Sequence, residues 1–408
     1  MSKPVLRVLS QISGDASGPP TWLDQQELQR LITENSPKFQ SIVGISTRSE
    51  QFPKSALRMQ IQVKLAENTI QTMNFLVKSK EQTNYDTLKF PRPHSFELEM
   101  HMYNEVLPAL EELYKNVGKS INFSPHSHKP KLVHPAKDSK CLYLDYLQDK
   151  GYKLANQPKG LSKSAMEAIL SKLAAYHAAT ARYLQLNPNQ LRELSNRSSR
   201  KESDHKIAEL KNFLQRKFSE SLRSNGLQDY EDKVKCYLKN LADCEKTDIK
   251  RSFNVISIGA CWPNNLLGHF DAFGNVKDAI FIDFGSVSHG PAIYDLFQLL
   301  LTAPAEKTEH FDAHLRYYQD ELNANLNLLN FKGSLPTLTD LQVELLDFGH
   351  WGVEVVMEIL PLVLADFESS DVDDIFKTRK YSEEIKKLLP WLENRAYFEV
   401  EPEPINYY

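Results

Sequence analysis

The sequence contains little of what marks several common classes of protein. It has only four cysteines in 408 residues. Their irregular spacing fits neither a zinc site nor a disulfide framework, so we expect reduced thiols and a cytoplasmic protein. The four are Cys141, Cys236, Cys244 and Cys261.

Neither sign of charge dominates, because 49 basic and 53 acidic residues give a net charge of -4. Nothing in that balance predicts binding to nucleic acid or to an anionic membrane. The longest apolar stretch, residues 353–367, is interrupted by Glu354, Glu358 and Asp366, so we expect no membrane-spanning helix. Residues 1–11 lack the apolar core of a signal peptide.

The remaining composition is that of a globular protein, with 41% hydrophobic and 25% charged residues. The length suits one large two-lobed unit or two domains. Near the amino terminus the pattern predicts a helix capped by Thr21, followed by strands at 39–45, 56–65 and 73–78 of an antiparallel sheet. From Ser162, which we expect to cap a helix, the pattern becomes helical.

The most informative stretch is residues 255–295, which predicts two apolar strands joined by a hairpin. Asn265 lies in the loop before the hairpin, and Asp283 follows the apolar run 279–282. Since the hairpin is short, the amide and the carboxylate can converge on one cation, and Mg²⁺ prefers such oxygen ligands. The alternative interpretation is an asparagine that caps a turn and an aspartate that ends a strand.

Residues 258–265 (IGACWPNN) and the Ile-Asp-Phe-Gly at 282–285 resemble motifs of the insect ecdysteroid-kinase-like family. This family is also called choline-kinase-like (CHK) and is related to choline kinases and aminoglycoside phosphotransferases. Its loop reads His-Gly-Asp-x-Trp-x-Asn-Asn. The resemblance makes Asn265 and Asp283 the metal ligands, as in protein kinases.

The same resemblance shows two departures in this loop. Ala260 stands where the family has its catalytic base, an aspartate, and Ile258 stands where the family has a histidine that braces the loop. No catalytic residue is therefore intact at these positions.

The resemblance extends over about residues 35–395 and implies an α+β, protein-kinase-like fold with two lobes. We expect a small lobe with an antiparallel sheet at 1–147 and a larger, mainly helical lobe at 148–408. ATP and magnesium are the implied cofactors, bound between the lobes.

Further nucleotide contacts follow from the same resemblance. Lys78 ends the strand at 73–78 and would contact the phosphates, with Glu99 as its helix partner and Glu97 as a competitor. A surface lysine is the alternative interpretation. Asp145 and Leu147 lie in the segment that resembles the linker between the lobes, where backbone groups would contact adenine.

The phosphate-covering loop departs from the family's Gly-Glu-Asn-Tyr-Ala-Ser. Residues 49–54 read SEQFPK, so Ser49 replaces a flexible glycine and Pro53 lacks a backbone donor. Lys54 could supply a charge instead, although a solvated turn lysine is the favoured interpretation.

Several other polar and aromatic residues are expected to be structural. His177 lies on an apolar helix face and is expected to be a hydrogen-bonded core residue, and Asp295 is expected to brace the catalytic loop. Phe348 and Trp351 are interpreted as core residues of a helical lobe that, in this family, builds the acceptor pocket.

Loss of a general base typically costs about 10²- to 10⁴-fold in rate. Together with the altered brace and phosphate loop, it favours a pseudokinase: a nucleotide- or small-molecule-binding protein with weak or absent phosphotransfer. The first alternative is an active ATP-dependent kinase that phosphorylates a hydroxyl of a steroid-like, apolar alcohol. The second is a scaffold that binds a protein.

Overall fold

The computed structural model describes residues 20, 23–36, 38–49, 56–80, 94–129, 141–156, 158–190, 194, 201–244, 252–365 and 372–399. Of the loop at 49–54, only Ser49 is among them, and the proposed cap Thr21 also lies outside them. Within the described residues, no helix has the length and apolarity needed to cross a membrane.

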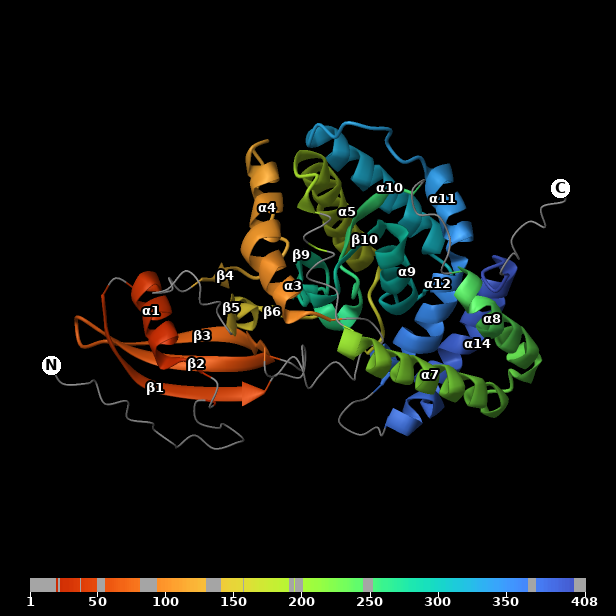
Figure 1. Ribbon diagram of the computed structural model, residues 1–408, viewed down its shortest axis with the longest axis horizontal. Helices are drawn as coiled ribbons and strands as arrows, with labels where there is room; N and C mark the ends of the chain where they lie inside the picture. The colour runs from red at the N-terminus through yellow and green to blue at the C-terminus, as the bar shows by residue number, and fades with distance from the viewer. Residues whose placement is uncertain are drawn as a thin grey trace.

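The amino-terminal part is a five-stranded antiparallel sheet in the order β1-β2-β3-β5-β4 (Figure 1). The three long predicted strands are confirmed, and β3 begins a few residues earlier than its apolar pattern. The strands are β1 (Phe39–Ser49), β2 (Ala56–Leu65), β3 (Ile70–Ser79), β4 (Ser127–His128) and β5 (Cys141–Asp145).

One face of this sheet is covered by α1 (Gln25–Asn35), whose N-cap is Asp24 (Figure 1). The Asp24 carboxylate accepts hydrogen bonds from the backbone N–H groups of Gln26 and Glu27, as an N-cap does. Leu28, Leu31 and Ile32 of the helix pack with alternate strand residues in a small core of their own. We call this the sheet core; its strand members are Ile45, Met59, Ile61, Val63, Phe75, Val77, Cys141 and Tyr143.

The other face of the sheet meets a long helix built from α3 (Phe96–His101), η1 (Met102–Val106) and α4 (Leu107–Lys115). The η1 segment is a π-helix, in which the Leu107 N–H bonds to the Met102 carbonyl. Pro108 explains this, because it has no N–H to donate to the Asn104 carbonyl. The freed carbonyl accepts a bond of 2.5 Å from Lys129 Nζ instead.

Most of the other described residues form the larger, mainly helical part on the right of Figure 1. Its central helix α5 (Lys163–Leu186) begins at Ser162, whose hydroxyl accepts the Ala165 N–H, as predicted. The other long helices are α7 (Lys201–Ser224), α8 (Glu231–Cys244), α9 (Ile293–Thr302), α10 (Phe311–Leu328), α11 (Leu338–Asp347) and α14 (Arg379–Asn394). One extended core, the helical core, fills this part and reaches the sheet through α3.

Two small antiparallel sheets are also present among the described residues. One has the order β6-β8-β9 and the other pairs β7 with β10. Their strands are β6 (Tyr152–Leu154), β7 (Asn254–Ser257), β8 (Leu266–Phe270), β9 (Val276–Phe281) and β10 (Ser288–Pro291). The strands β8 and β9 form a hairpin. At its open end the Ile282 N–H donates to the Asn265 carbonyl at 3.0 Å, so the hairpin holds the loops of Asn265 and Asp283 side by side.

Candidate nucleotide and metal site

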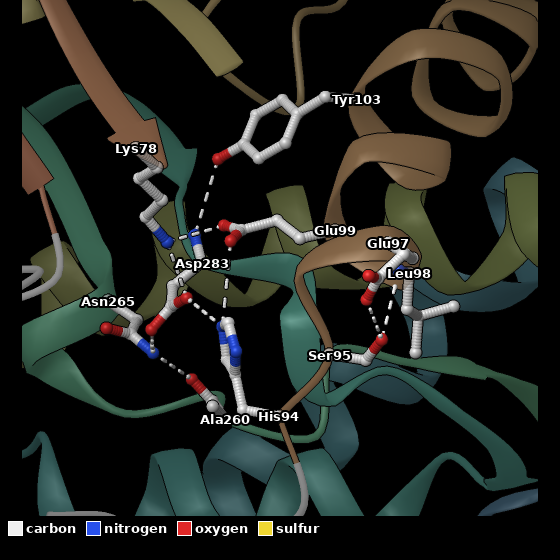
Figure 2. A network of polar contacts seen from close by, with 10 residues as sticks. All are labelled: Lys78, His94, Ser95, Glu97, Leu98, Glu99, Tyr103, Ala260, Asn265 and Asp283. Atoms are coloured by element: carbon white, nitrogen blue, oxygen red, sulfur yellow. Dashed lines mark hydrogen bonds and ion pairs between the residues drawn. The ribbon is translucent and has the colours of Figure 1, made fainter. Parts of the chain in front are cut away.

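Lys78, near the end of β3, is buried at the centre of the site, with 1% of its surface exposed (Figure 2). Its Nζ donates to Glu99 Oε1 at 2.5 Å and to Asp283 Oδ1 at 2.7 Å. Glu97 instead pairs with the exposed Lys80, also at 2.5 Å. The structure therefore excludes the surface-lysine interpretation and selects Glu99 as the helix partner.

The charges of this group depend on one another because it is buried. Burial would lower the pKa of Lys78, but Asp283 and Glu99 outweigh it, and the pKa lies above its ordinary value. Burial would raise the pKa of Asp283, yet Lys78 and then His94 hold it well below its usual range. Burial raises the pKa of Glu99, and Lys78 only partly offsets this.

Asp283 has a left-handed backbone, with φ 69° and ψ 67°, which short polar side chains tolerate. Its backbone N–H donates to the hydroxyl of Tyr103 at 3.3 Å. Asn265, in η5 (Pro263–Asn265), donates from Nδ2 to the Ala260 carbonyl at 3.2 Å and lies 3.5 Å from Asp283 Oδ2. The structure thus brings together the four residues Lys78, Glu99, Asn265 and Asp283.

The loop at 258–261 is held by two side chains one turn apart on α9. Asp295 accepts the backbone N–H groups of Ile258 at 2.6 Å and Gly259 at 3.0 Å. Gln298 accepts the Cys261 N–H at 2.7 Å and donates to the Gly259 carbonyl at 3.0 Å. Asp295 braces the loop as predicted, while Gln298 was not foreseen.

His177 is a fully buried partner of this brace. Its Nε2 lies 3.1 Å from Asp295 Oδ2, and its Nδ1 lies 2.6 Å from the hydroxyl of Tyr318. These contacts confirm the expected core histidine. Ile258, at the position of the family's bracing histidine, is buried in the helical core. Asp295 and Gln298 therefore hold the loop without a polar side chain at position 258.

Ala260 presents only a methyl group where the family has an aspartate, and only 2% of its surface is exposed. Its carbonyl is bound by Asn265 (Figure 2). The backbone of the loop is therefore in place, but Ala260 offers no group that could accept a proton.

At the predicted linker, the Asp145 carboxylate contacts His128 Nε2 and Lys150 Nζ, both at 2.7 Å. The hydrogen bond from His128, followed by Lys150, lowers the pKa of Asp145 to about 2. Leu147 packs in a separate apolar cluster with Leu267, Ile280 and Ile282. The Asp145 side chain is thus already engaged, and adenine contact by backbone groups here stays a prediction.

Sequence reasoning missed His94 and Tyr103. His94 Nε2 lies 2.9 Å from Asp283 Oδ1 and 3.6 Å from Glu99 Oε2. The only sequence signal for His94 is its place before Ser95, whose side chain caps α3. Tyr103 follows Glu99 by four residues, so a shared helix face could have indicated it.

A cavity of about 400 Å³ lies beside the loop at 258–261. It is lined by Leu98, Gly259, Val287, Tyr294, Trp351 and several serines. Trp351 is only partly buried and stacks on Phe348, with ring centroids 4.7 Å apart. Phe348 is a core residue as expected, whereas Trp351 reaches the cavity.

A small antiparallel sheet, a larger helical part and a buried Lys–Glu pair beside an aspartate after a short hairpin define a protein-kinase-like, two-lobed fold. The chain belongs to the ecdysteroid kinase-like family, whose family model matches residues 49–331. The resemblance read from the sequence is thereby confirmed, as is the predicted fold class.

Solved structures with similarity to the chain include small-molecule kinases. Choline kinase LicA from Streptococcus pneumoniae is 10% identical, with 90% of this chain and 99% of that one covered and a TM-score of 0.37. A choline kinase from Cryptosporidium parvum Iowa II is 10% identical, with 92% and 99% covered and a TM-score of 0.44. A microcompartment-associated aminopropanol kinase is 12% identical, with 92% and 99% covered and a TM-score of 0.41. Comparison with curated proteins finds no match.

Proposed function

We propose that the chain binds a magnesium-bound nucleotide and transfers its phosphoryl group weakly or not at all. The observation that carries this proposal is Ala260. Hydrogen bonds with Asp295 and Asn265 hold the backbone of the catalytic loop, yet the loop has only a methyl group at the position of the base. Lys78 and Asp283 nearby keep the charges that a metal-bound triphosphate needs.

The side chains fit a magnesium nucleotide. Asn265 and Asp283 are oxygen donors of the kind that Mg²⁺ takes together with substrate phosphates. Lys78, held by Glu99, supplies a fixed positive charge for the phosphates. When bound, the metal would neutralise charge on the phosphate oxygens, while Lys78 and Asn265 would position them.

The missing base sets the expected rate. General-base catalysis is worth about 10²- to 10⁴-fold, or about 3 to 5 kcal/mol of activation free energy. Since phosphoryl transfer depends largely on positioning and charge, this loss alone would leave a slow enzyme. The changed residues at 49–54 are expected to slow it further.

The cavity beside Gly259 supports a small-molecule ligand. Its volume is within the usual range for ligand pockets, which begins at about 300 Å³. Aromatic and aliphatic side chains with a few serine hydroxyls favour an apolar molecule that carries a hydroxyl. A steroid-like alcohol has this chemistry, and such a ligand is also the acceptor in the alternative of an active kinase.

Among the described residues, Cys141, Cys236 and Cys261 form no disulfide. Cysteines without disulfides are usual in reducing compartments. This supports the cytoplasmic location expected from the sequence.

Nucleotide binding is tested by thermal unfolding of the full chain with and without magnesium-ATP. We expect ATP with magnesium to raise Tm in the wild type and not in Asp283→Asn. Asparagine tolerates the left-handed backbone at this position, so the substitution removes the charge with little strain. Asp278→Asn is the control, because Asp278 lies on β9 and pairs with Lys172; its Tm rise should match that of the wild type.

Two results would contradict the proposal. The absence of any shift at millimolar nucleotide would favour the scaffold alternative. ATP-dependent phosphorylation of a hydroxylated steroid at rates typical of kinases, about 1 to 100 per second, would establish the active kinase.

A further inference from the structure

Three side chains with metal-binding groups meet beside Lys78, from the segment before α3, from α3 and from the loop after β9 (Figure 2). They are His94, Glu99 and Asp283, and their ligand atoms all lie within 4.8 Å of one another. His94 Nε2 is 2.9 Å from Asp283 Oδ1 and 3.6 Å from Glu99 Oε2. Donors that share one zinc ion, each bound at about 2.0 to 2.2 Å, are separated by similar distances.

One of these potential ligand atoms is buried and accepts no hydrogen bond from the described residues. Glu99 Oε2 has no hydrogen-bond partner in the described part of the chain, although the residue is fully buried. A buried acceptor without a partner costs about 1 to 3 kcal/mol, and more when it is charged. The atom that faces it, His94 Nε2, is itself a possible metal ligand.

The position of His94 depends on a glycine. A Cβ on Gly285 would lie 2.1 Å from His94 Nε2, and the Gly285 carbonyl accepts the backbone N–H of Ser95 at 2.8 Å. The imidazole therefore occupies space that any side chain at position 285 would fill. Its Nδ1 is buried with no hydrogen-bond partner among the described residues, so the polar contacts of the ring are made through Nε2.

The charges of the cluster favour a cation. Glu99 and Asp283 carry two negative charges, and Lys78 supplies one positive charge to both carboxylates. Lys78 contacts Glu99 through Oε1, which leaves Oε2 available to a metal ion. A donor set of one imidazole and two carboxylates suits Zn²⁺, whereas Mg²⁺ selects oxygen ligands and retains its water.

We propose that His94, Glu99 and Asp283 form a binding site for a transition-metal dication, with Zn²⁺ as the preferred ion, that is filled without nucleotide. The site shares Asp283 with the magnesium site proposed above, but it uses two further ligands and does not depend on nucleotide binding. An ion there ties the start of α3 to the loop after β9.

The test is calorimetric titration of the nucleotide-free, full-length protein with zinc chloride, and separately with magnesium chloride. We expect Zn²⁺ to bind at one site and more tightly than Mg²⁺. Outer-shell partners of metal ligands are worth about 10- to 100-fold in affinity, so removal of a ligand in His94→Ala should weaken zinc binding by more than about tenfold.

A matched control separates this site from exposed clusters. His310 lies with Glu306 and Glu309 in a more exposed group of similar composition. His310→Ala should leave the zinc affinity unchanged. Equal affinity in wild type and His94→Ala, or loss of binding in His310→Ala, would overturn the proposal.

Gly285→Ala gives an independent check, because it displaces the imidazole without removing any ligand. We expect it to weaken zinc binding and to abolish the rise in Tm that zinc produces in the wild type. Wild-type zinc affinity in this variant would contradict the site. Failure of zinc binding together with a Tm rise in magnesium-ATP would disprove this inference and leave the proposed function standing.

Discussion

Lys78 is the residue on which the charge of the site depends. Its ammonium group lies between two carboxylates, with almost no exposure to water. Removing one partner of a buried ion pair leaves uncompensated charge and costs about 3 to 5 kcal/mol. Removing one partner of an exposed pair costs about 1 kcal/mol or less.

We therefore predict that Lys78→Met lowers the free energy of unfolding by about 3 kcal/mol or more. Lys80→Met is the control, since the Lys80–Glu97 pair has a similar distance but lies at the surface; it should change stability by less than about 1 kcal/mol. Urea denaturation of both variants measures the difference. Similar losses in the two would show that Glu99 and Asp283 do not require the lysine.

Glu344 makes stability depend on pH. Burial, with some contribution from Asp340 and Asp347, raises its pKa from 4.5 to about 7. Between these values the folded state holds a proton that the unfolded state has lost, so unfolding becomes easier as pH rises through this range. The Oε1 atom accepts the Phe253 N–H at 2.7 Å, which glutamine can also do.

Glu344→Gln is therefore expected to remove part of the fall in unfolding free energy between pH 4.5 and about 7. The measurement is a series of urea titrations of wild type and variant across this range. Parallel curves for the two proteins would mean that the carboxyl titrates normally.

Among the helices, α9 carries the brace of the loop at 258–261. Gln298→Leu would leave the Cys261 N–H and the Gly259 carbonyl without their partner. Each such buried group costs about 1 to 3 kcal/mol, and we predict a total loss of about 3 kcal/mol of stability. Gln319→Leu, which removes one partly buried bond to the Pro336 carbonyl, should cost clearly less. Equal melting temperatures of the two variants would argue against the brace.

In the described helices, two irregular segments have the same cause. The π-helical segments η1 and η7 (Val355–Ile359) are each followed by Leu-Pro, at Pro108 and Pro361. A proline inside a helix removes one backbone donor, and the wider turn before it accommodates the loss. The sequence shows where the prolines lie, but whether the helix ends there or forms a wider turn depends on the packing on both sides.

The long strands and α5 could be predicted because their apolar patterns are regular and their faces are buried. The start of α1 could be predicted only to within a few residues. A hydroxyl at Thr21 and a carboxylate at Asp24 are both good caps, and only the structure shows that Asp24 binds the free N–H groups.

Across the whole molecule, the predictable part of the site is the part that lies in segments resembling the family's motifs. Lys78 lies near the end of a strand, Glu99 follows a helix start, and Asn265 and Asp283 flank a hairpin. The contacts of His94 and Gln298 arise between segments that are far apart in the chain. No local pattern encodes such contacts, and the resemblance that indicated Asp295 as a brace pointed to neither His94 nor Gln298, so sequence reasoning did not find them.

The division of the interior into a sheet core and a helical core has a practical consequence. Cys141 lies in the first and Cys261 in the second, while Cys236 is exposed. Burial raises the pKa of Cys261 well above its ordinary value, which further suppresses its thiolate form. Among the described cysteines, each core thus holds one shielded sulfhydryl, and the rates at which an alkylating reagent modifies these two report separately how often each core opens.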